Sequence, residues 1–290
     1  MFTGAFTALV TPFKKGVVDY DALSDFLEFQ IAEGISGMVP CGTTGESSTL
    51  SHEEHRRVVE FVVKQVRGKV PVIAGAGSNS TDKAIHLSQA AKKLGANATL
   101  QVAPYYNKPT AEGFLRHFTA IADAVDLPMV IYNIAGRTGK NIENPTMLKL
   151  AAHRNIVAVK EASGDIAQMM NLIAQKPASF AVLSGDDNLA FPLIALGGKG
   201  VISVASNLVP GRMKEMVSAA LRGQWDRARE LHYRLLPLFK AIFIETNPIP
   251  IKAALAMKGL MKEVYRLPMC PMGEENRKTL AVVLRELKVL

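Results

Sequence analysis

The chain has 290 residues, of which 48% are hydrophobic, and this is enough for a large α/β core in one domain or two. Its net charge of +8 is spread along the chain, without the basic cluster interleaved with aromatic residues that nucleic-acid binding requires. No apolar run approaches the roughly 18 residues of a membrane span, and residues 1–16 lack signal-peptide features. The only two cysteines, Cys41 and Cys270, form no motif, so we expect a reduced, cytoplasmic protein. From the charge pattern and the lack of a long apolar run, we expect it to bind neither nucleic acid nor membrane.

Short apolar runs recur through the first 205 residues and predict parallel strands that are buried on both faces. They are rich in valine, isoleucine and alanine and are mostly continuous rather than alternating. Segments with helical periodicity lie between them, and several of these follow a capping serine or threonine. The predicted strands cover residues 6–10, 37–40, 70–74, 98–103, 128–132, 156–159, 180–183 and 200–204, and the predicted helices between them include residues 21–33, 52–67, 82–94, 112–124 and 166–175.

Eight strand-helix units of this size predict an α/β fold, a (β/α)₈ TIM barrel over residues 1–206. A doubly wound sheet is the structural alternative, but it usually has fewer strands and a nucleotide-binding fingerprint. After the eighth run the strand signal stops, and residues 207–290 predict a helical appendage at the C-terminus. Its expected helices cover residues 212–222, 224–244, 249–258 and 274–287.

The predicted strands end in unusual polar residues, and the carboxyl ends of the strands are where a TIM barrel carries its reactive groups. A barrel without chemistry has no need to gather hydroxyl, phenol and cationic side chains at one rim. We therefore expect an active site there. Its candidate residues are Thr43 and Thr44 in the "GTTGE" turn, Tyr105, Tyr106, Tyr132, Arg137 and Lys160.

Lys160 ends the apolar run of residues 156–159, at a place where burial would favour the neutral amine. A neutral amine attacks a ketone to form a Schiff base, and the protonated imine then acts as an electron sink. Tyr132, one unit earlier, is near enough to move a proton. The structural alternatives are a lysine paired with Glu161 and a tyrosine that only packs, but the other polar residues of the rim favour chemistry.

No metal ion or organic cofactor is expected. The "HEEH" of residues 52–55 has the wrong spacing for a zinc protease. "GAGSN" lacks the third glycine of a dinucleotide fingerprint, and "GGKG" at residues 197–200 lacks the spacing of a phosphate-binding loop.

The chain resembles the 4-hydroxy-tetrahydrodipicolinate synthase (dihydrodipicolinate synthase) family of pyruvate-dependent lyases, nearly from end to end. The motifs that carry this resemblance are "PCGTTGESSTLSHEEH", "YNIAGRTG", "VKEASGD" and "NPIPIKAAL". Arg137 separates this family from the sialic-acid lyases, which lack an arginine at that position. The resemblance implies the condensation of pyruvate with L-aspartate 4-semialdehyde, a branch-point step of lysine and diaminopimelate biosynthesis.

The resemblance also implies a role for each rim residue. Lys160 would form the imine, Thr43 and Thr44 would hold the carboxylate of pyruvate, and Tyr132 would be the general acid and base. The backbone at Gly185 and Ile202 would line the pocket.

Arg137 would bind the carboxylate of the semialdehyde at the site entrance. Tyr106 would cross a dimer interface into the neighbouring active site, where the Thr44 hydroxyl would link it to Tyr132 in a proton relay. The implied assembly is a homotetramer built from two tight dimers.

In family members inhibited by lysine, the effector binds at the dimer interface. By resemblance, the lining here would comprise Ser47, Ser48, His52, His55, Asn79 and Tyr105. A glutamate usually completes that pocket, and this chain has Lys83 in its place. A cation facing the ammonium groups of lysine predicts weak or absent inhibition.

Two alternative functions remain at the level of the sequence. The first is another pyruvate-dependent aldolase that acts on a 2-keto-3-deoxy sugar acid, and Arg137 argues against it. The second is a catalytically inactive relative that serves as a binding protein. The joint presence of Lys160, Tyr132 and Thr44 argues against inactivity.

Overall fold

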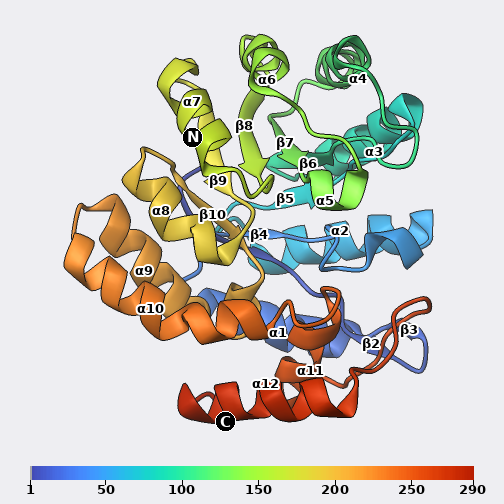
Figure 1. Ribbon diagram of the computed structural model, residues 1–290. Helices are drawn as coiled ribbons and strands as arrows, with labels where there is room; N and C mark the ends of the chain where they lie inside the picture. Colours follow the sequence, from blue (N-terminus) through green and yellow to red (C-terminus); the bar gives the residue numbers. More distant parts are fainter. Residues whose placement is uncertain (1) are drawn as a thin grey trace.

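A computed structural model describes residues 2–290 and shows a closed barrel of parallel strands surrounded by helices (Figure 1). The strands are hydrogen-bonded in the order β4-β1-β10-β9-β8-β7-β6-β5, and a bridge between Met38 and Val72 joins the two ends of this row. The TIM-barrel prediction is confirmed. The barrel strands are β1 (Gly4–Ala8), β4 (Gly37–Val39), β5 (Ile73–Gly75), β6 (Ala98–Val102), β7 (Met129–Asn133), β8 (Ile156–Glu161), β9 (Ala181–Ser184) and β10 (Gly200–Ser203).

The strands are apolar on both faces because each face packs against a separate core. Inward side chains such as Phe6, Leu100 and Ile202 fill the barrel interior. Outward side chains such as Ile131 and Val159 pack against the surrounding helices. Continuous apolar runs are therefore what this sheet requires, and alternation would be typical of a sheet with one face in water.

The surrounding helices follow the strands in sequence, and polar caps fix where several of them begin. The side chains of Asp19, Ser51, Ser80, Thr110 and Asp165 each accept a backbone N–H in the first turn of the helix that follows. The helices are α1 (Tyr20–Ala32), α2 (His52–Val66), α3 (Thr81–Lys93), α4 (Ala111–Ala124), α5 (Ala135–Thr138), α6 (Asn144–Ala151), α7 (Ile166–Gln175), α8 (Ala190–Ala195) and α9 (Pro210–Leu221).

The C-terminal region is helical, as predicted, and comprises α10 (Trp225–Ala241), α11 (Ile249–Met257) and α12 (Glu274–Glu286) after α9. The helix α9 packs against β1 and β10, so it belongs to the helical ring of the barrel although it follows residue 206. Figure 1 shows α11 and α12 near α1, away from α4 and α6. The division of the chain at residue 206 stays a prediction.

The structure adds short elements that the periodicity did not predict. A hairpin of β2 (Phe13–Lys14) and β3 (Val17–Val18) precedes α1. Short 3-10 turns occupy η1 (Ser47–Thr49), η2 (Asp187–Leu189) and η3 (Ala205–Asn207). Within residues 2–290, every helix is too short or too polar to cross a membrane.

Candidate active site

Lys160 and Tyr132 lie side by side at the carboxyl ends of neighbouring strands. They are direct partners in the register of β7 and β8, and the Lys160 Nζ lies 4.0 Å from the centre of the Tyr132 ring. Glu161 points to the other side of the sheet, as alternate strand residues do. Its carboxylate accepts hydrogen bonds from the Asn133 amide at 3.0 Å and the Ser163 backbone N–H at 2.8 Å. The alternative of a Lys160–Glu161 ion pair is therefore wrong.

Burial shifts the titration of both groups in directions that suit imine chemistry. Lys160 is only 5% exposed, and this burial lowers the pKa of its amine to about 8, against an opposing effect of Asp186 and Asp187. Burial raises the pKa of the Tyr132 phenol, so the phenol keeps its proton at neutral pH. The pair therefore offers an amine with an appreciable neutral fraction beside a proton donor.

Gly185 leaves the space that the Lys160 side chain occupies. A Cβ atom at position 185 would lie 2.7 Å from the Cβ of Ala162 and 3.1 Å from the Cε of Lys160. The Gly185 N–H donates to the Glu161 carbonyl at 2.7 Å, which holds the loop after β9 against β8. A side chain at this position would crowd Ala162 and the Lys160 side chain.

The turn of residues 42–46 presents two hydroxyl groups to the same cavity. The Gly45 N–H donates to the Gly42 carbonyl at 3.1 Å, and the Glu46 N–H donates to the Thr43 carbonyl at 3.0 Å. Thr44 is buried, whereas Thr43 is partly exposed. A compact turn that offers hydroxyls and backbone N–H groups is suited to bind a carboxylate.

Asn247 connects this turn to Arg137, a role that the sequence did not reveal. Its side-chain amide donates to the Thr44 Oγ1 at 3.0 Å, and its carbonyl accepts from the Arg137 Nη2 at 3.1 Å. Arg137 itself is exposed at the mouth of the cavity. The only sequence signal was its place in the "NPIPIKAAL" motif, immediately before α11.

The structure gathers six predicted site residues around one small cavity. Two predicted residues lie elsewhere: Ile202 is buried in the barrel interior, and Tyr106 is 90% exposed on the loop after β6. The lining residues that sequence reasoning did not name as site residues include Asp186, Val204, Phe243 and Asn247. The predicted residues that line the cavity are Thr43, Thr44, Tyr132, Arg137, Lys160 and Gly185.

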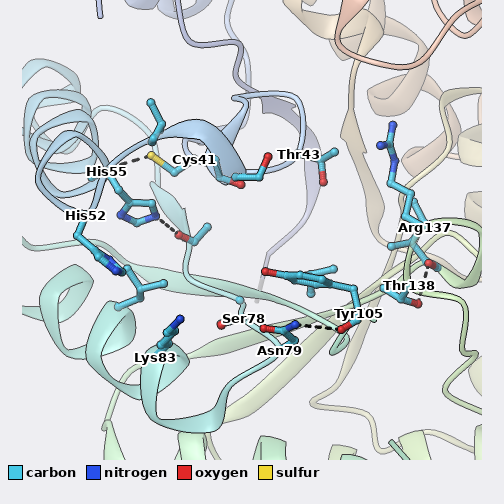
Figure 2. Close-up of a pocket in the computed structure, with 18 residues that line it drawn as sticks. Cys41, Thr43, His52, His55, Ser78, Asn79, Lys83, Tyr105, Arg137 and Thr138 are labelled. Atoms are coloured by element: carbon cyan, nitrogen blue, oxygen red, sulfur yellow. Dashed lines mark hydrogen bonds between the residues drawn. The ribbon is translucent and has the colours of Figure 1, made fainter. Parts of the chain in front are cut away.

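A second, larger pocket of about 490 Å³ opens beside the active site and shares Thr43 and Arg137 with it (Figure 2). Figure 2 shows Lys83 and His52 on one side of this pocket and Arg137 on the other. Among the residues that the structure describes, its charged lining residues are the cations Lys83 and Arg137, with no aspartate or glutamate. All seven residues of the predicted effector site line it: Ser47, Ser48, His52, His55, Asn79, Lys83 and Tyr105.

His55 forms part of the pocket wall instead of a free contact. It is buried, and its Nε2 lies 2.7 Å from the Gly75 carbonyl oxygen. Burial lowers the pKa of the ring, so the neutral tautomer that donates from Nε2 satisfies this geometry. One ring nitrogen is thereby unavailable to an effector.

A buried amine at the carboxyl rim of a TIM barrel, next to a phenol and a hydroxyl-bearing turn, defines a lyase or aldolase of the Schiff-base class. The comparison with known families agrees with this class. The model of the dihydrodipicolinate synthetase family matches residues 1–287, and the chain belongs to that family.

Individual relatives resemble the chain over almost their whole length. It is 54% identical over 285 residues to a 4-hydroxy-tetrahydrodipicolinate synthase of Thermodesulfovibrio yellowstonii, covering 98% of each chain. The crystal structure of dihydrodipicolinate synthase from Aquifex aeolicus matches with a TM-score of 0.98 at 49% identity, covering 99% of each chain. A structure described as the first monomeric dihydrodipicolinate synthase variant matches with a TM-score of 0.98 at 42% identity, covering 100% of this chain and 98% of that one. The family resemblance of the motifs is confirmed.

Proposed function

We propose that this chain catalyses the condensation of pyruvate with L-aspartate 4-semialdehyde to 4-hydroxy-tetrahydrodipicolinate, a step of lysine and diaminopimelate biosynthesis. The observation that carries the proposal is the buried Lys160 amine beside Tyr132, in one cavity with Thr44 and Arg137. The relatives that cover the whole chain favour this reaction over the sugar-acid alternative. They also favour an enzyme over an inactive binding protein.

The reaction begins when the neutral Lys160 amine attacks the C2 carbonyl of pyruvate. The carbinolamine that forms loses water and gives a protonated imine, and Tyr132 supplies and accepts the protons of these steps. The hydroxyls of Thr43 and Thr44 and the N–H groups of their turn bind the carboxylate of pyruvate. This fixes the ketone carbon in front of the amine.

The protonated imine withdraws electrons, so the C3 methyl group loses a proton and becomes an enamine carbon. This carbon attacks the aldehyde carbon of the semialdehyde, whose carboxylate binds Arg137 at the entrance. The semialdehyde's amino group then attacks the imine carbon, closes the ring and releases the free Lys160 amine. No organic cofactor is needed because the lysine imine is the electron sink.

We assign Tyr106 to the active site of another subunit. Its side chain is 90% exposed and lies outside the cavity of its own chain. The proposal therefore includes a dimer in which Tyr106 enters the partner's site and joins Thr44 and Tyr132 in a proton relay. A homotetramer of two such dimers and a cytoplasmic location stay predictions.

Borohydride trapping tests the chemistry. With pyruvate and borohydride, we expect a reduced adduct on the peptide that contains Lys160, and turnover when the semialdehyde is added. The matched control is Lys160→Arg, which keeps the charge but is too basic to be a neutral nucleophile. Trapping on another lysine would contradict the role of Lys160, and turnover with only a sugar-derived aldehyde would favour the alternative substrate.

A further inference from the structure

A second buried lysine, Lys252 of α11, lies behind the active-site turn and outside the cavity. Its Nζ is 2.5 Å from Oε1 of Glu46, and the two side chains are 0% and 2% exposed. Neither residue is among those that line the active-site cavity. Because a buried ion pair loses much of its attraction to desolvation, it is weak evidence of a purely stabilising role.

The ion pair ties together four segments that are far apart in the sequence. Lys252 also donates to the Thr11 carbonyl at 3.1 Å, and its Nζ lies 4.5 Å from the centre of the Phe13 ring. The second carboxylate oxygen of Glu46 accepts the backbone N–H of Arg266 at 3.2 Å. The loop after β1, the active-site turn, α11 and the loop before α12 therefore meet at the Glu46–Lys252 ion pair.

Glu46 is also the residue at which the active-site turn ends. Its φ of 53° is left-handed, a conformation that a non-glycine residue adopts at an energetic cost unless its surroundings hold it. The Thr11 hydroxyl donates to the Gly45 carbonyl at 2.7 Å, next to the ion pair. These contacts restrain the second half of the turn from the side opposite the cavity.

The segment that carries Lys252 reaches the turn from the cavity side as well. Asn247, just before α11, donates to the Thr44 hydroxyl oxygen. The turn is thus held between Asn247 on one side and Lys252 on the other. A shift of about 1 Å in such a constellation is enough to reduce activity about a hundredfold.

We infer that Glu46 and Lys252 are positioning residues of the pyruvate site, which hold the turn so that Thr43 and Thr44 meet the substrate carboxylate. This inference rests on the proposed function. It predicts that loss of the ion pair raises the pyruvate concentration needed for imine formation. The pH midpoint of imine formation should not move, because it belongs to the Lys160 amine.

The test compares Glu46→Gln, Lys252→Met and the double variant by borohydride trapping at increasing pyruvate and by thermal unfolding. Each single variant should lose thermal stability, because it leaves one buried charge unpaired. The double variant removes both charges and should recover most of the lost Tm. Its half-saturating pyruvate concentration should still be raised about tenfold or more, because a displaced turn aligns its hydroxyl and N–H groups poorly with the substrate carboxylate.

Val217→Ala in the buried face of α9 is the matched control for stability. It should lower Tm without changing the pyruvate dependence. The inference would be overturned if the double variant kept the wild-type pyruvate dependence. It would also be overturned if Val217→Ala raised the half-saturating pyruvate concentration as much as the double variant does. The double variant keeps this test decisive if a single variant fails to fold. Absence of trapping in the wild type would overturn the proposed function itself. If the wild type is trapped and the variants show the same pyruvate dependence, only the positioning role is overturned.

Discussion

Replacing Lys160 by methionine should abolish imine formation and stabilise the fold below pH 8. Burial lowers the pKa of Lys160 from 10.5 to about 8. Between these two values the unfolded chain binds more protons than the folded one, so stability rises with pH across this window and is lowest below it. At about 1.36 kcal/mol for each pH unit of the window, the buried ammonium costs about 3 kcal/mol of folding free energy at pH 7. Methionine has a similar shape and no charge.

Urea unfolding of the wild type and Lys160→Met at pH 7 and at pH 10 measures this cost. The variant should be more stable by about 3 kcal/mol at pH 7, and the difference should shrink towards zero near pH 10.5. Lys149→Met, at an exposed position of α6, is the control and should change stability little at either pH. An equal difference at both pH values, or a less stable variant at pH 7, would refute the argument that burial sets the titration of Lys160.

Three further variants test other parts of the site. Arg137→Ala should leave imine trapping intact but lower semialdehyde turnover roughly 100- to 1,000-fold, because it removes a bidentate pair of charge-assisted hydrogen bonds in a partly desolvated site; unchanged steady-state turnover would exclude this role. Tyr106→Phe should be inactive on its own, and mixing it with inactive Lys160→Ala subunits should restore activity in hybrid dimers; hybrids without activity would place the tyrosine's action in its own subunit. Gly185→Ala should weaken pyruvate trapping, because the added methyl would lie 3.1 Å from the Lys160 Cε; trapping at the wild-type level would show that the lysine can shift without loss.

The barrel could be predicted because its strands are buried on both faces and leave continuous apolar runs. The end of the sixth run was harder to predict, since the strand continues through two charged residues, Lys160 and Glu161. Glu161 is tolerated in the sheet because Asn133 and Ser163 satisfy its carboxylate. Such pairing depends on a neighbouring strand and a following turn, and no periodicity in the run itself reveals it.

The candidate site likewise contains residues that could be predicted from the sequence and residues that could not. Residues at strand ends, such as Tyr132 and Lys160, could be predicted because barrel geometry brings all strand ends to one rim. Asn247 and Lys252 could not, because they reach the rim from the C-terminal helical region. Lys252 meets Glu46 across 206 positions of the chain, and neither residue carries a local signal of that contact.

L-lysine should inhibit this enzyme weakly or not at all, because residues 2–290 present Lys83 and no carboxylate to an ammonium group in the pocket beside the active site. Loss of a charge-assisted bond costs roughly 1.5–3 kcal/mol, which corresponds to binding about 10- to 100-fold weaker. Asp82 precedes Lys83 on α3, where adjacent residues point about 100° apart, so it compensates poorly.

A titration of the condensation assay with L-lysine, compared between the wild type and Lys83→Glu, tests this electrostatic argument. The variant restores a carboxylate to the pocket and should gain inhibition, whereas Lys93→Glu, the same charge change at the far end of α3, should not. Since His55 already contacts the Gly75 carbonyl, it offers an effector only one ring nitrogen and cannot replace the carboxylate. Inhibition of the wild type at sub-millimolar lysine, or a Lys83→Glu variant that stays insensitive, would show that position 83 does not control the response.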